Sequence, residues 1–224
     1  MKIIELSGLP GCGKSTIVTE IEKNFQKQKL LTIQNLSQDR KKFLNNKYLQ
    51  FLMDVFSLKN LNVNFLIILY TFSYKVTKER LGRITKSIIF NAKLYEKSKE
   101  ENQEYLVLDQ GIIVLLTSIP HENIIKENLI FISLVKALKR KYKNTLFINC
   151  TLDKKKVIQQ IRMRNKEGHR FDSLSAEMLE NLLDIRKYNL ELVQKYLQAD
   201  SKVLVLDMKV ENEINVEKIL KFIN

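Results

Sequence analysis

A glycine-rich segment close to the N-terminus constrains this chain more than any other feature. Residues 8–15 read GLPGCGKS, which matches the pattern G-x-x-x-x-G-K-[ST] at every fixed position. An apolar run precedes it, and a helix is expected to begin near Lys14. A strand, such a loop and a helix in this order are typical of a site that cradles phosphates with backbone N–H groups. We expect this loop to comprise Gly8, Gly11, Cys12, Gly13, Lys14, Ser15 and Thr16.

Two side chains of this loop carry the expected chemistry. Lys14 should reach the β- and γ-phosphates of a nucleoside triphosphate, and the Ser15 hydroxyl should bind Mg²⁺. The N-terminal end of the following helix adds positive potential at the same place. The loop therefore predicts a site for a nucleotide together with its metal ion.

Short apolar runs alternate with longer helix-like segments along the rest of the chain. This alternation predicts parallel strands joined by helices, hence an α/β fold with a five-stranded parallel sheet and helices on both faces. In such a sheet the ligand lies beyond the carboxyl ends of the strands. The expected strands are residues 2–6, 30–36, 105–108, 145–150 and 203–206. The expected helices are residues 14–28, about 39–99 with breaks near Asn60 and Ser73, a helical region up to about 142, 153–165, 176–198 and a short last helix.

A carboxylate follows the third apolar run. Residues 105–108 read YLVL, and Asp109 comes directly after them. At the end of a strand beside the phosphate loop, this carboxylate could hold Mg²⁺ through a water molecule. The alternative is that Asp109 caps the next helix.

Arginines gather in one short segment. Arg162, Arg164 and Arg170 lie close together, with Gly168 between the last two. Guanidinium groups grip phosphate oxygens in pairs of hydrogen bonds, and a glycine offers a hinge. The segment therefore predicts a lid, about residues 162–173, that closes over the phosphates and places its arginines on the transferring group. The alternative is an exposed basic helix end.

The second expected strand is followed by another acidic side chain, Asp39. At the carboxyl edge of the sheet it could accept the proton of an acceptor hydroxyl during catalysis. The neighbouring Arg40 could bind an acceptor anion.

The size and the net charge of the chain limit how many domains it can have and what it can bind. The 224 residues suit one domain, 1–224, and the net charge is +13. The lysines that cause it are spread along the chain, so we do not expect nucleic acid as a partner.

The longest apolar region, about residues 65–72, is short of the roughly 20 residues of a membrane span, and no signal segment precedes the loop. We expect a cytoplasmic protein without a membrane partner, for which a homodimer is one option, and in which Cys12 and Cys150 stay reduced and only pack.

The combined pattern resembles the thymidylate kinase and deoxynucleoside kinase group of P-loop kinases. The phosphate loop, the VLDQG segment at 107–111 and the arginine segment from 161 to 172 stand where that group has its loop, its Asp-Arg strand end and its lid. The resemblance implies a sheet ordered 2-3-1-4-5, Mg-ATP as the donor and a small acceptor under the lid. The chain departs from the group at Gln110, where the group has Arg, and it lacks an Arg-Glu-Pro-type segment after the second strand.

The sequence therefore predicts a kinase that acts on a small molecule, most simply a nucleoside or nucleotide. Two rival interpretations remain. One is a kinase of another alcohol or of a sugar nucleotide, as in the zeta-toxin group. The other is a nucleotide-binding regulator that uses the lid as a switch without transferring phosphate. GTPases are disfavoured because no N-K-x-D motif is present, and transporter ATPases because no L-S-G-G-Q motif is present.

Overall fold

The fold was analysed in a computed structural model of the whole chain. The structure describes residues 1–24, 30–32, 61–74, 76–77, 81, 82, 84, 87, 91, 94, 95, 98–120, 122–163, 171 and 174–223.

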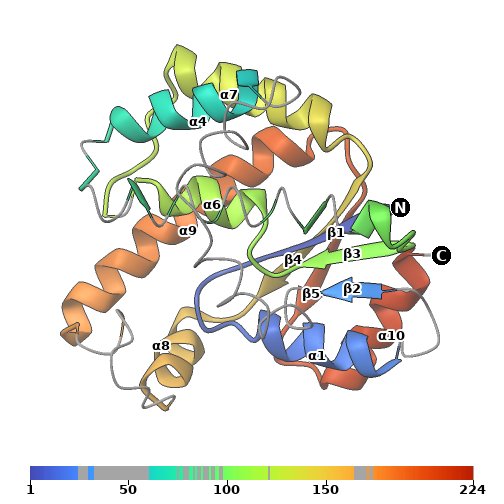
Figure 1. Cartoon of the computed structure of the whole chain (residues 1–224). Coiled ribbons are helices and arrows are strands. Elements are labelled where there is room, and N and C mark those ends of the chain that lie inside the picture. Colours follow the sequence, from blue (N-terminus) through green and yellow to red (C-terminus); the bar gives the residue numbers. More distant parts are fainter. Residues whose placement is uncertain are drawn as a thin grey trace.

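Five parallel strands form the centre of the molecule (Figure 1). The sheet order is β2-β3-β1-β4-β5, as the resemblance implied. In the registers, Ile4 of β1 lies between Val107 of β3 and Leu146 of β4. This order places β1 in the middle, so the loop that follows it lies at the centre of the carboxyl edge. The strands are β1 (Lys2–Ser7), β2 (Leu30–Thr32), β3 (Tyr105–Leu108), β4 (Thr145–Thr151) and β5 (Val203–Asp207).

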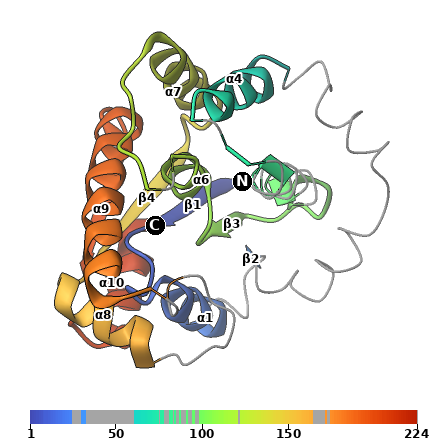
Figure 2. The same cartoon turned by 90° about the vertical axis from the view of Figure 1, so that its left-hand side faces the viewer.

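Helices cover both faces of this sheet. On one face lie α1 (Lys14–Asn24) and α10 (Asn212–Ile223). The other face is covered by α6 (Ile112–Ser118), with α4 (Leu61–Phe72), α7 (Leu129–Lys141) and the later part of α9 (Ala176–Gln198) packed around it. Figures 1 and 2 both show α6 between the sheet and the α4–α7 pair. Helix α8 (Lys154–Met163) packs with the first part of α9 against the core beside α1.

Strand β1 divides its side chains between the two faces, because successive residues of a strand point to opposite sides. Ile4 and Leu6 are fully buried in the core with α1 and α10. Glu5 and Ser7 point to the other face, where they contact α6 and α9. The central strand therefore sends one carboxylate into the protein interior beneath α6.

The helical region expected between Asp109 and Tyr142 proves to be two helices with a loop between them. Helix α6 ends at Ser118, shortly before Pro120, which has no N–H to continue the helix. Asn189 of α9 holds the loop: its side chain accepts a hydrogen bond from Ile125 N (2.8 Å) and donates one to Asn123 O (2.9 Å). The expected helical region is therefore largely helical, but it is divided in two because this tertiary anchor stabilises a non-helical segment.

Helix α4 is mostly apolar and contains no charged residue. It packs against α7, where Tyr70 lies against Phe131 with ring centroids 5.8 Å apart. Phe65 and Phe72 remain exposed. Among the helices in the described part of the chain, none has the length and apolarity needed to cross a bilayer.

Candidate nucleotide site

The loop between β1 and α1 has the backbone of a phosphate cradle. Gly11 and Gly13 have φ angles of +86° and +95°, a conformation that other residues adopt only with strain. A Cβ on Gly11 would lie 2.9 Å from Cγ1 of Ile161 on α8, so the loop and α8 are in close contact. Glycine is therefore required here both by the backbone angle and by the space.

Lys14 lies over this loop. Its Nζ donates hydrogen bonds to Gly8 O and Leu9 O, both at 2.9 Å. These carbonyls hold the ammonium group at the mouth of the loop without neutralising it. An anion bound by the loop would therefore meet a positive charge that is already in position.

Ser15 and Asp109 come together although 94 residues separate them. Ser15 Oγ donates to Asp109 Oδ2 at 3.0 Å. Asp109 is 7% exposed, and its other oxygen, Oδ1, is buried without a hydrogen-bond partner among the described residues. A buried carboxylate oxygen that lacks a partner is costly, unless a cation binds there. A hydroxyl and a carboxylate are ligands that Mg²⁺ prefers, so these two residues fit a magnesium ion.

The alternative role of Asp109, capping the next helix, does not hold. The N-cap of α6 is Gly111, and no side-chain cap hydrogen bond is made there. The N-terminal turn is instead bound by Glu5, whose Oε1 accepts a hydrogen bond from Ile113 N at 2.6 Å. Asp109 therefore does not cap α6. It contacts Ser15 of the phosphate loop and borders the cavity described below.

Glu5 is a buried carboxyl group directly beneath the segment that carries Asp109. Burial raises its pKa from 4.5 to about 7, although hydrogen bonds from the backbone of Ile113 and Ile112 oppose the shift. A Cβ on Gly111 would lie 2.4 Å from Cδ of Glu5. The carboxyl group fits only because residue 111 has no side chain.

We expect Glu5→Gln to remove a pH dependence of stability. Between pH 4.5 and 7 folded Glu5 keeps a proton that the unfolded chain has lost, so the free energy of unfolding of the wild type should fall as pH rises through this window, by about 3 kcal/mol. Above pH 7 the effect is complete. Urea unfolding at several pH values should show a smaller fall for Glu5→Gln, while the exposed Glu104→Gln should follow the wild type. Equal slopes for all three proteins would show that Glu5 does not titrate in this window.

Gly111→Ala should destabilise the protein by roughly 1–3 kcal/mol, because the methyl group overlaps the Glu5 carboxyl. Gly82→Ala is the matched control, since a Cβ there meets nothing within 4 Å. Urea denaturation should separate the two variants clearly. If both unfold at the wild-type midpoint, the contact between Gly111 and Glu5 is not tight in solution.

Arg186 on α9 binds the opposite end of α6. It is 6% exposed, and its Nη1 donates to Thr117 O at 2.8 Å, in the last turn of the helix. A cation at a helix C-terminus is favourable, as an anion is at the N-terminus. Helix α6 is thus held between Glu5 and Arg186. Arg186 was not among the predicted site residues; the available signal was a guanidinium within the apolar stripe of α9.

The site residues border one cavity of about 280 Å³. The phosphate loop and Asp109 form one wall of this cavity, and α6 and Arg186 form another. Ile161 and Phe171, on either side of the arginine segment, also border it. The cavity is lined by Gly8, Leu9, Pro10, Gly11, Gly13, Lys14, Ser15, Asp109, Gln110, Val114, Thr117, Ser118, Ile161, Phe171, Arg186 and Leu190.

The other predicted site residues have different placements. Cys12 is buried beneath the loop, and Thr16 is exposed on the first turn of α1. Arg162 is exposed at the end of α8, where its Nη2 donates to Leu174 O at 2.6 Å. Asp39, Arg164 and Arg170 lie outside the described residues, so their roles stay predictions.

Comparisons by sequence give no family: no protein-family model and no curated protein matches the chain. Comparisons by structure do give matches. Deoxyadenosine kinase from M. mycoides with bound dATP matches with a TM-score of 0.52 and 17% identity, over 100% of both chains. The same kinase with products dCMP and a flexible dCDP bound matches with a TM-score of 0.51 and 17% identity, over 99% of this chain and 98% of that chain. The chain therefore has, over its whole length, the fold of a P-loop deoxynucleoside kinase.

Proposed function

We propose that this protein is a Mg-ATP-dependent phosphotransferase that moves the γ-phosphoryl group to a small acceptor, a nucleoside or a nucleotide. The observation that carries the proposal is the pairing of Ser15 with the buried Asp109 at the mouth of the phosphate loop. A loop that only bound phosphate would not need a buried carboxylate with an unsatisfied oxygen beside it. The nucleotides bound to the structural relatives, dATP and dCTP, support the same class of ligand.

Each part of the site has a role in this proposal. The loop N–H groups and Lys14 bind the β- and γ-phosphates, and Ser15 with Asp109 holds the metal ion. Bound there, Mg²⁺ neutralises charge on the phosphate oxygens. Phosphoryl transfer needs little more than positioning and compensation of charge, which these groups supply.

The acceptor side of the cavity is formed by α6 and α9. Val114 and Leu190 give it an apolar surface, while Gln110, Ser118 and Arg186 add polar groups. A mixed surface of this kind suits a nucleoside, whose base is apolar on its faces and polar at its edges. We assign the acceptor to this side.

Four further residues complete the proposal. A lid of about residues 162–173 brings Arg164 and Arg170, and with them Arg162, to the transferring group and excludes water. Asp39 accepts the proton if the acceptor is a hydroxyl, and it is not needed if the acceptor is an ionised phosphate. The whole chain, residues 1–224, acts as one kinase domain.

An acceptor screen tests the proposal. Purified protein with Mg-ATP should release ADP in the presence of one or more nucleosides or nucleoside monophosphates, and the phosphorylated acceptor should be identified by mass spectrometry. Transfer to sugars or sugar nucleotides alone would favour the zeta-toxin-like alternative. Tight ATP binding without turnover on any acceptor would favour the regulator and overturn the kinase.

A further inference from the structure

The two cysteines of the chain lie side by side, although 138 positions separate them in the sequence. Cys12 belongs to the phosphate loop and Cys150 to the end of β4, and both are free and buried. A Cβ on Gly8 would lie 2.8 Å from Cys12 Sγ and 3.2 Å from Cys150 Cβ. Cys12 Sγ and Cys150 Cβ therefore lie no further apart than the sum of these two distances from the Gly8 Cβ position.

Residue 8 lies against both cysteines, which have room there because it is a glycine. The parallel pairing of β1 with β4 ends at Ser7 and Asn149, so Gly8 and Cys150 directly follow the last paired residues. Any side chain on residue 8 would meet both cysteines. A disulfide needs Cα atoms about 4.4–6.8 Å apart, a separation that neighbouring positions of paired strands and a loop folded over them can provide.

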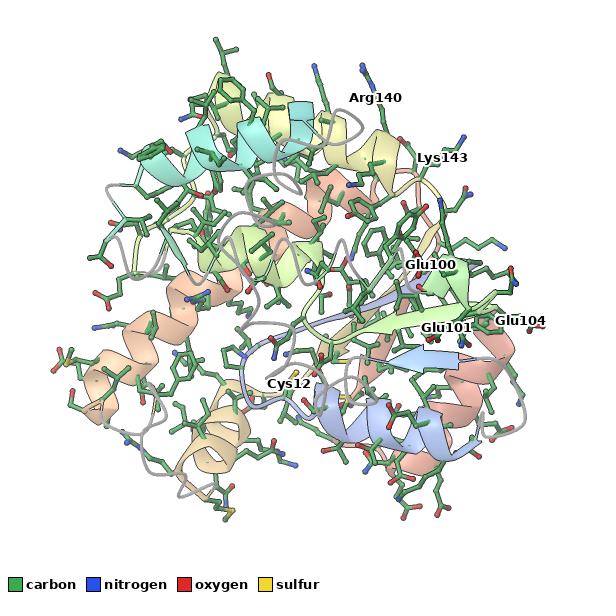
Figure 3. The ribbon with its side chains drawn as sticks, in the orientation of Figure 1. Cys12, Glu100, Glu101, Glu104, Arg140 and Lys143 are labelled. Atoms are coloured by element: carbon green, nitrogen blue, oxygen red, sulfur yellow. The ribbon has the colours of Figure 1, made fainter. Side chains whose placement is uncertain are left out.

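The electrostatics of the pair agree with this closeness. Burial raises the pKa of Cys150 to about 12, and the neighbouring Cys12 adds to the shift. Lys14 Nζ lies 3.7 Å from Cys12 Sγ. Figure 3 shows Cys12 inside the molecule, below the carboxyl edge of the sheet. The thiol pair thus lies directly under the proposed phosphate site.

A second cavity gives small molecules a way to the pair. It has a volume of about 660 Å³ and lies between α9 and the ends of β4 and β5. Cys150 forms part of its wall, next to Asn149 and Leu9 of the phosphate loop. A solute the size of a peroxide in this cavity would therefore meet the wall that Cys150 forms, without passing through the nucleotide cavity.

We propose that Cys12 and Cys150 form an oxidisable modification site, in which a small peroxide converts the thiol pair into a disulfide that closes the phosphate loop to nucleotide. One sulfur attacks the peroxide, the O–O bond breaks, and a sulfenic acid and one water result. The second sulfur then attacks the first, the S–O bond breaks, and its proton leaves with the hydroxyl group as a second water. Two thiols are oxidised and one peroxide is reduced to two waters.

The disulfide acts on binding because Cys12 lies in the middle of the cradle. Its neighbours Gly11 and Gly13 hold the positive φ angles that aim the loop N–H groups. A bond to Cys150 draws Cys12 towards β4 and turns these N–H groups away from the phosphates. The contact of Lys14 with Cys12 Sγ is lost at the same time. We expect nucleotide affinity to fall by at least about tenfold, or roughly 1.4 kcal/mol.

The test uses the full-length protein, hydrogen peroxide and ATP. Intact mass should show the loss of two hydrogen atoms after peroxide, and peptide mapping should join Cys12 to Cys150. ATP binding, measured by titration calorimetry, should weaken after oxidation and return to its first value after reduction with dithiothreitol. None of these readouts requires phosphate transfer, so failure of the kinase proposal leaves this test intact.

Cys150→Ser and Cys150→Ala are the matched controls, because Cys150 is not part of the nucleotide cavity. Both should bind ATP as the reduced wild type does and should keep that affinity after peroxide, although Cys12 is still present. Peptide mapping of the disulfide is done on the wild-type protein, so the proposal can be tested even if both variants fold poorly. Peroxide treatment that leaves the two thiols unlinked, or a Cys12–Cys150 disulfide with unchanged ATP affinity, overturns the proposal.

Discussion

Lys14→Ala should lower ATP turnover by roughly 10²–10³-fold or more, while the protein stays folded. The ammonium group is held at the mouth of the loop by two carbonyl oxygens, Gly8 O and Leu9 O, and it belongs to no hydrophobic cluster. Its removal therefore costs compensation of phosphate charge and no core packing. Acceptor-dependent ADP release, with circular dichroism as the check of folding, measures the effect.

Lys23→Ala is a suitable control for this variant. Lys23 lies on the same helix, but its Nζ pairs with Glu20 on the surface at 2.8 Å. It should turn over ATP at the wild-type rate. Wild-type turnover in folded Lys14→Ala would contradict the assignment of the loop to catalysis.

Asp109→Asn should change the magnesium requirement more than nucleotide binding. The amide still accepts from Ser15, but it has lost the charge of the buried carboxylate. Removing a group that holds or orients a metal ion typically costs about 10–100-fold in metal affinity or activity. We therefore expect the Mg²⁺ concentration for half-maximal turnover to rise by at least about tenfold. ATP affinity should change much less, because the loop N–H groups still bind the phosphates.

The chain offers a matched control for this prediction as well. Asp207 ends β5 as Asp109 follows β3, but Asp207 is exposed, and its Oδ1 accepts a hydrogen bond from Lys209 N. Asp207→Asn should need no more Mg²⁺ than the wild type. If a Mg²⁺ titration gives the same curve for Asp109→Asn, the carboxylate has only a structural role.

Features that rest on local chemistry were predicted from the sequence. The phosphate loop is specified by its glycines and Lys14, whatever surrounds it. Strand β3 and helix α9 have the predicted bounds, because an apolar run and a helical stripe are each visible within a single segment. The sheet order could be predicted only through the resemblance, since the residues of a strand do not indicate which strands it pairs with.

Helix α9 contains buried polar residues whose role could not be predicted from the sequence. Its stripe of leucines and Val193 is largely buried, but Arg186 and Asn189 are buried on this helix as well. These polar residues are tolerated because Arg186 meets the end of α6 and Asn189 meets the loop before α7. Their partners are more than 60 positions away, so no periodicity within α9 could reveal them.

A phosphate loop within an α/β fold could be predicted from the sequence, because strands, turns and helices follow from residues that are neighbours in the chain. The positions of Glu5 beneath α6, of Asp109 at Ser15 and of Cys12 near Cys150 depend instead on how the whole chain folds. These contacts join residues 108, 94 and 138 positions apart. Their energies come from burial and from close approach, which exist only when the whole sheet has assembled.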